Sequence, residues 1–121
     1  MTGCRFCLAE GLLADRPIHR NASFYVLGRH PRLSPDAAII VPLRHVATPF
    51  GITAAEWRDM EDALAMAQAH LADLSPEGFT LGWNVGAVAG QEIMHAHLHV
   101  IARFGGRPGA GRGIHAALTD R

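Results

Sequence analysis

Three histidines, His95, His97 and His99, alternate with apolar residues in one short segment. On a strand, successive side chains point to opposite faces, so the three imidazoles would share one face while the apolar residues face the core. Neighbouring histidines would then lie roughly 6.5–7 Å apart at Cα. At this spacing one ring can attack while its neighbours bind phosphate oxygens or donate a proton. Imidazole suits these tasks, because its unperturbed pKa of about 6.5 leaves it a neutral nucleophile or a proton donor near neutrality.

A structural role is the alternative for any one of these histidines. A single histidine in a strand is usually a satisfied core or surface residue. Three on one face are different, because burying three polar rings together costs free energy unless something binds them. The row therefore indicates a functional surface.

Cys4 and Cys7 form a Cys-x-x-Cys pair near the start of the chain. Such a pair is typical of a redox site or of half a zinc site, and it also arises by chance. A thioredoxin-like redox pair lies in a βαβ setting, which this segment lacks. A zinc site needs two further ligands. His45 and one of the alternating histidines are candidates, and spacing alone does not select them.

Short strands around one helix are predicted to position these residues. Apolar, aromatic and β-branched runs predict strands over 23–27, 37–41, 78–84 and 93–103. Thr53 and Glu56 form a capping box that begins a helix, and residues 75–78 end it. The order strand, strand, helix, strand, strand predicts an α+β fold, an antiparallel sheet with one long helix on one face. The apolar residues of that helix recur at three- and four-residue spacing: Trp57, Met60, Leu64, Ala67, Leu71 and Leu74.

The composition indicates one globular domain over residues 1–121, with a glycine-rich tail from about 105 to 121. Lysine is absent, and 11 arginines balance 11 acids. A net charge of zero argues against polynucleotide binding, which needs clustered cations. No stretch resembles a signal peptide or reaches the length of a membrane span. We therefore expect a cytoplasmic protein with reduced thiols and no membrane partner.

The residues around the triad resemble the signature of the histidine triad (HIT) proteins. Residues 90–101 match its Gly-Gln followed by His-φ-His-φ-His-φ-φ, and residues 41–45 are similar to its Ile-Pro-x-x-His segment. Asn84 precedes Gln91 by seven residues, as the family's asparagine does. The resemblance extends from Cys4 to about residue 103 and is greatest to bacterial zinc-containing Hint-like and diadenosine polyphosphate hydrolase-like members. It implies a homodimeric α+β domain that hydrolyses or transfers at the α-phosphorus of a nucleotide.

The resemblance also implies roles for single residues. His97 would be the nucleophile that is transiently nucleotidylated, with its other nitrogen donating to a backbone carbonyl. His99 would contact the transferred phosphate, and Asn84 and Gln91 would hold phosphate or leaving-group oxygens. Two further residues would line the base pocket, or else simply pack in the core: Phe6 and Leu27. Bacterial members bind a structural zinc through four residues, which here correspond to Cys4, Cys7, His45 and His95.

Three positions depart from the family pattern. Arg29 stands where many members have an aspartate that binds the ribose, Ala37 replaces a histidine, and Glu92 replaces a small residue. An arginine cannot accept hydrogen bonds from a ribose diol. Arg29 would instead meet a phosphate bidentately or lie in solvent.

Three functions are compatible with these residues. The leading one is a HIT-type hydrolase or transferase that acts on nucleoside phosphoramidates or dinucleoside polyphosphates. The second is a non-catalytic nucleotide- or partner-binding module, which Arg29 and Ala37 favour. The third is a zinc enzyme with an open His-x-His site, which would need a third ligand and a general base. Glu92 is the only obvious carboxylate for that purpose.

Overall fold

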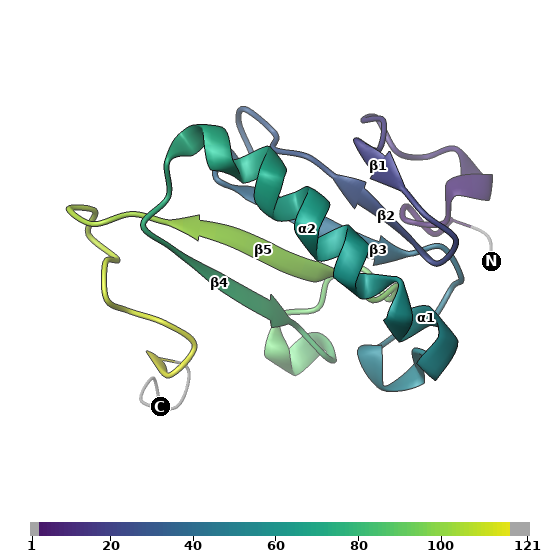
Figure 1. Ribbon diagram of the computed structural model, residues 1–121. Coiled ribbons are helices and arrows are strands. Elements are labelled where there is room, and N and C mark those ends of the chain that lie inside the picture. Colours follow the sequence, from purple (N-terminus) through teal and green to yellow (C-terminus); the bar gives the residue numbers. More distant parts are fainter. Residues whose placement is uncertain (1–2, 117–121) are drawn as a thin grey trace.

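A computed structural model describes residues 3–116, which form a sheet with a helical layer on one face (Figure 1). The sheet has five strands in the order β1-β2-β3-β5-β4, and all of its pairings are antiparallel. The strands are β1 (His19–Arg20), β2 (Phe24–Leu27), β3 (Ala37–Pro42), β4 (Gly78–Trp83) and β5 (Leu98–Arg103). The helices are α1 (Ala54–Arg58) and α2 (Met60–Leu71). The predicted α+β fold is confirmed.

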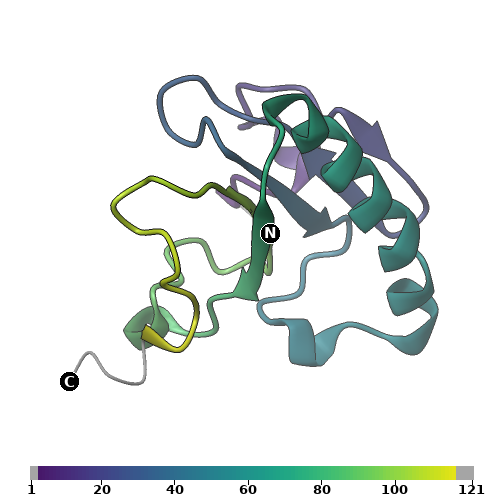
Figure 2. The same cartoon turned by 60° about the vertical axis from the view of Figure 1, so that its left-hand side comes forward.

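Four short 3-10 helices complete the described elements. They are η1 (Leu8–Glu10), η2 (Pro49–Gly51), η3 (Ala72–Leu74) and η4 (Ala87–Ala89). In Figure 2 the glycine-rich segment that follows β5 leaves the sheet beside β4 and lies away from α2. The part of the predicted tail beyond residue 116 lies outside the described residues. None of the described helices combines the length and the apolar character that a membrane crossing requires.

The helical layer begins as predicted but is interrupted. Both halves of the capping box are present, because Thr53 Oγ1 accepts from the Glu56 N–H and the Glu56 carboxylate accepts from the Thr53 N–H. The predicted single helix is interrupted at Asp59, which ends α1 and precedes α2. The Asp59 carbonyl accepts from the Asn21 side chain and its carboxylate from the Ser23 hydroxyl. These contacts tie the interruption to the turn between β1 and β2.

The core lies on both faces of the sheet. Within β2, Phe24 and Val26 join the cluster under α2, whereas Tyr25 and Leu27 join a second cluster on the other face. Of the predicted helix face, Met60, Ala67 and Leu71 are buried. Leu64 and Leu74 pack partly buried against the same cluster, whereas Trp57 is exposed. On the other face the N-terminal segment, residues 3–17, covers the sheet through Phe6, Leu8 and Leu13. This face of the sheet is therefore covered by the N-terminal segment, whereas the opposite face is covered by helix.

The strand predicted over 93–103 begins later, at Leu98. Residues 95 and 96 have partners outside a strand ladder, because the Ala96 N–H donates to the Val46 carbonyl and His95 Nε2 to the Pro42 carbonyl. From Leu98 onward burial alternates with a period of two. His99 faces away from the helical core and pairs with Ile39 in β3 and Gly82 in β4.

Candidate functional site

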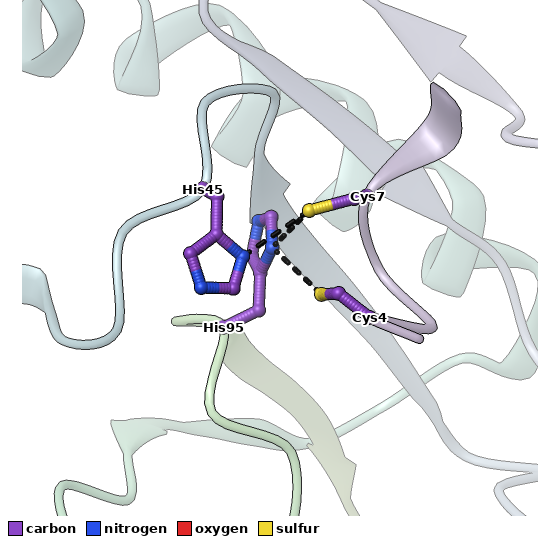
Figure 3. A group of neighbouring side chains, drawn as sticks. All are labelled: Cys4, Cys7, His45 and His95. Carbon is purple, nitrogen blue, oxygen red and sulfur yellow. Dashed lines mark hydrogen bonds between the residues drawn. The ribbon is translucent and has the colours of Figure 1, made fainter. Parts of the chain in front are cut away.

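Two cysteines and two histidines from three distant segments lie together (Figure 3). The N-terminal segment supplies Cys4 and Cys7, the loop after β3 supplies His45, and the segment before β5 supplies His95. Their ligand atoms all lie within 4.8 Å of one another. His95 Nδ1 is 3.4 Å from Cys4 Sγ and 3.5 Å from Cys7 Sγ, and His45 Nδ1 is 3.2 Å from Cys7 Sγ. These are the four residues that the resemblance implied.

The donor set fits a tetrahedral zinc ion. Zn–S bonds of about 2.3 Å and Zn–N bonds of about 2.0–2.1 Å place tetrahedral S and N ligands about 3.5 Å apart, close to the distances between these atoms. His95 Nε2 is 2.7 Å from the Pro42 carbonyl oxygen. Since a carbonyl only accepts, Nε2 carries the proton and Nδ1 presents its lone pair to the cysteines. Burial lowers the pKa of His95 and favours the neutral ring that a metal needs.

The Cys7 thiol resists ionisation unless a cation is present. Burial, and then the hydrogen bond and charge of Cys4, raise the pKa of Cys7 to about 11. A divalent cation reverses this preference, because it stabilises the thiolate form directly. Among residues 3–116 no other group of three or more histidine, cysteine, aspartate or glutamate side chains is arranged to hold a metal. An open His-x-His metal site therefore has no support in the geometry.

His97 is not part of the cysteine cluster and has a fixed tautomer. Its Nδ1 is 2.9 Å from the carbonyl oxygen of His95, so Nδ1 donates a proton to that carbonyl and Nε2 keeps its lone pair. This is the backbone contact that sequence analysis predicted. The His97 ring centroid is 4.9 Å from that of Phe6 and 5.0 Å from that of His99. Phe6 is held in turn, because its carbonyl accepts from the Tyr25 hydroxyl at 2.6 Å.

His99 carries a polar atom without a partner. Its Nε2 is buried, and it is the only such side-chain nitrogen or oxygen within residues 3–116 that makes no hydrogen bond. Buried polar atoms are nearly always satisfied, so this nitrogen is suited to a ligand oxygen. Burial, and then the charge of His97, lower the pKa of His99 and favour the neutral ring.

A cavity of about 220 Å³ contains both of these histidines. It lies on the face of the sheet opposite α2, where Phe6 and Leu27 belong to the second core cluster. Its walls come from the N-terminal segment, from β2 and the loop after it, from β3, and from the segment that leads into β5. The lining residues are Arg5, Phe6, Asp15, Leu27, Gly28, His30, Leu33, Ser34, Ala37, Ile39, His97 and His99. The structure thus brings together four residues predicted from the sequence, and we call this space the triad cavity.

Four other residues predicted to be catalytic or to bind substrate do not line the triad cavity. The Gln91 amide is saturated by backbone groups, because Nε2 donates to the carbonyls of Ala47 and Ile93 while Oε1 accepts from the Gly86 N–H. Asn84 is exposed beside the loop that Gln91 braces. The Arg29 guanidinium is directed to the Pro35 carbonyl. His95 is also absent from the lining, since its ring serves the cysteine cluster.

Sequence reasoning missed several residues of the cavity wall. Asp15, His30 and Ser34 come from loops whose paths carry no periodic signal. His30 Nδ1 accepts from the backbone N–H groups of Arg32 and Leu33, which closes the loop on itself.

A contact from α2 fixes where this loop leaves β2. His70 Nε2 accepts from the Arg29 N–H at 3.0 Å. A Cβ atom on Gly28 would lie only 2.8 Å from that nitrogen and 3.1 Å from Ile18. Glycine is therefore required at position 28 for the helix to hold the loop.

Comparison with known proteins gives a consistent result. A family model described as the HIT domain matches residues 18–106. A solved structure named Hit Like Protein is 25% identical, covers 78% of this chain and 92% of its own, and superposes with a TM-score of 0.65. A HIT family protein from Bacillus anthracis is 24% identical over 86% of this chain and 75% of its own, with a TM-score of 0.73. A HIT family hydrolase from Clostridium thermocellum is 22% identical, covers 89% of this chain and 96% of its own, and superposes with a TM-score of 0.68. No curated protein matches the sequence.

Proposed function

We propose that this chain, which belongs to the HIT domain family, is a nucleotide hydrolase or nucleotidyl transferase. Its substrates would be nucleoside phosphoramidates or dinucleoside polyphosphates, cleaved at the α-phosphorus. One observation carries the proposal: His97, with its tautomer fixed, shares a cavity with the unpartnered buried nitrogen of His99. The hydrolase from Clostridium thermocellum has the same fold, which agrees with this assignment.

The proposed reaction has two displacements at phosphorus. His97 Nε2 attacks the α-phosphorus, a P–N bond forms, and the bond to the leaving group breaks. The leaving group keeps the electron pair, and an amine leaving group takes up a proton from water. The imidazolium that results keeps its Nδ1–H on the His95 carbonyl, which stabilises the positive charge. Water or another acceptor then attacks the phosphorus, loses a proton, and releases His97 as neutral imidazole. His99 Nε2, in its protonated tautomer, would donate to a phosphate oxygen throughout.

The remaining proposed roles concern binding and support. Phe6 and Leu27 would contact the base, because they form an apolar part of the triad cavity beside His97. Gln91 supports the turn after β4, and Asn84, which is exposed beside that turn, would hold a leaving-group oxygen. Zinc would be structural, since its four ligands leave no open position for substrate. Its proposed ligands are Cys4, Cys7, His45 and His95.

The experiment is a turnover screen with a covalent readout. Purified protein is offered adenosine and guanosine phosphoramidates and dinucleoside polyphosphates, and the working enzyme is quenched without acid and analysed by mass spectrometry. We expect turnover and a nucleotide mass on the peptide that contains His97. His97→Ala should lower turnover by about 10³-fold or more, with zinc content and melting temperature unchanged. His115→Ala, a matched change of an exposed histidine outside the triad cavity, should turn over normally.

A non-catalytic nucleotide-binding module is the second candidate. The saturated Gln91 amide and the orientation of Arg29 favour it, because neither residue faces the triad cavity. The same screen separates the two candidates. Binding without turnover and without a His97 adduct supports the module, and a His97→Ala variant that works at the wild-type rate refutes the covalent route.

A further inference from the structure

The triad cavity contains one carboxylate, that of Asp15. Asp15 comes from the N-terminal segment between η1 and β1, and its side chain is exposed. Within residues 3–116 it makes no ion pair and no side-chain hydrogen bond. The other ionisable residues of the lining are one arginine and three histidines: Arg5, His30, His97 and His99. Asp15 is therefore a free acceptor in a cavity whose other ionisable groups suit anions.

The charge of Asp15 restricts what it can bind. A carboxylate only accepts hydrogen bonds, and it repels a phosphate that approaches the same cavity. It is therefore suited to an uncharged part of a ligand that presents O–H or N–H donors. The apolar residues beside it, Phe6, Leu27, Leu33 and Ile39, suit the faces of a planar base. Arg29 supplies no acceptor here, because a guanidinium only donates hydrogen bonds, and it donates to the Pro35 carbonyl.

We infer that Asp15 determines substrate specificity by accepting hydrogen bonds from paired donors on the nucleoside part of the substrate. This inference rests on the proposed function. The donors are either the sugar hydroxyls or N–H groups on the edge of the base, and both are bound by the same carboxylate chemistry. Asp15 thus binds the uncharged end of a molecule whose phosphorus lies at His97 and His99.

The test compares nucleotides with inorganic phosphate by calorimetry on the wild type and on Asp15→Asn. If Asp15 accepts hydrogen bonds from the nucleoside, Asp15→Asn should raise the Kd for AMP or GMP by about ten-fold. The Kd for inorganic phosphate should stay the same or fall, because a repulsive charge has been removed. If Asp15 does not contact the nucleoside, Asp15→Asn should leave the Kd for AMP and GMP unchanged or lower it. That result would overturn the inference.

Two further comparisons identify the donor. Wild type should prefer AMP to its 2′,3′-dideoxy analogue if sugar hydroxyls are bound, or GMP to IMP if a base amino group is bound. Asp15→Asn should lose whichever preference exists, and either loss supports the inference. Asp73→Asn, which removes an exposed carboxylate from η3, outside the lining, is the matched control.

The failure of this inference differs from the failure of the proposed function. If the wild type neither binds nor turns over any nucleotide, the proposed function fails and the role of Asp15 fails with it. If the wild type binds nucleotides and Asp15→Asn binds them with the same Kd and the same preferences, only the inference fails. Melting temperatures of both variants show that the fold is retained.

Discussion

The two nitrogens of each triad imidazole have different partners, and the difference decides what each residue can do. His95 donates to the Pro42 carbonyl and directs its other nitrogen at two thiols, which suits it to bind a metal. His97 donates to the backbone of His95 and keeps a lone pair, which suits it to the proposed attack on phosphorus. His99 keeps a buried nitrogen without a partner, which suits it to a phosphate oxygen. Three identical side chains thus differ through their backbone contacts.

Glu56 provides a prediction about acid stability. The hydrogen bond from Arg44, followed by bonds from Thr53, holds the pKa of Glu56 at about 2. A carboxyl whose folded pKa is depressed stabilises the fold above its unfolded pKa, and this stability is lost as pH falls from 4.5 toward about 2. Since the Arg44 side chain is 49% exposed, solvent screening leaves a contribution of about 1–2 kcal/mol. Arg44→Met should lose about that much at pH 6 and less at pH 3.

Urea unfolding at the two pH values checks the prediction for Glu56. Arg58→Met removes another exposed arginine of α1 and should change stability by less than about 0.5 kcal/mol at both. Equal losses for Arg44→Met at pH 6 and pH 3 would show that the ion pair does not set the pKa of Glu56.

Residues with a motif could be located from the sequence, whereas residues on irregular loops could not. The grouping of Cys4, Cys7, His45 and His95 is confirmed, because family resemblance fixes which histidines accompany the cysteines. Asp15 and His30 had no such signal. Their position in the triad cavity depends on how the N-terminal segment and the loop after β2 fold over the sheet. The same loop path explains why Arg29 turns toward Pro35 instead of the triad cavity.

Among the elements, the N-terminal segment has little regular structure of its own. It has one turn of 3-10 helix and is held by apolar packing and by the Tyr25 hydroxyl on the Phe6 carbonyl. It nevertheless supplies one wall of the triad cavity through Arg5, Phe6 and Asp15. A metal bound at Cys4 and Cys7 would fix this wall to the sheet through the two histidines.

Metal removal is therefore expected to affect both stability and the triad cavity. We expect about one zinc per chain in protein purified without chelator. Cys4→Ser combined with Cys7→Ser should abolish zinc binding and lower the melting temperature by about 10 °C or more, because metal binding adds directly to folding free energy. Metal analysis and calorimetry measure the two effects.

The control for the metal is His115→Gln, which removes an exposed histidine outside the cluster and should keep zinc and melting temperature. Wild-type protein that contains no zinc and has two free reduced thiols would refute the metal site. If zinc is lost without any change in melting temperature, the segment is held by its apolar contacts alone.

The helix and strand boundaries could be predicted from the sequence where local chemistry sets them. They were harder to predict where tertiary contacts set them. The capping box located the start of α1, and Ser75, whose φ is 53°, lies where the helical layer was expected to end. The interruption at Asp59 depends on contacts with Asn21 and Ser23, which no helical pattern contains. β1 was missed because it has only two residues.

At the scale of the whole molecule, α2 does not cover the sheet evenly. It packs over β2 and β3, and Figure 1 shows β4 beside the helix instead of under it. As a result, an apolar groove of about 380 Å³ lies between α2 and the strands β4 and β5. Its lining residues are Glu61, Leu64, Ala65, Gln68, Phe79, Leu81 and Val100. β4 is also an edge strand, and edge strands with apolar faces tend to pair with other chains.

We expect this groove to be covered by a second copy of the chain, as the HIT resemblance implies and as twofold symmetry commonly provides. Leu81 lies on β4 and is 40% exposed although it is apolar, and Trp57 is 41% exposed while its ring packs on Trp83. Analytical ultracentrifugation at micromolar concentration should find twice the chain mass of 13.0 kDa. Leu81→Glu should shift the population to monomer, because burying an unpaired carboxylate costs at least about 2–3 kcal/mol.

Leu12→Glu, on the N-terminal segment away from the groove, should leave the dimer intact. A wild type that sediments only at 13.0 kDa, or a Leu81→Glu dimer as tight as the wild type, would show that this face is not the interface.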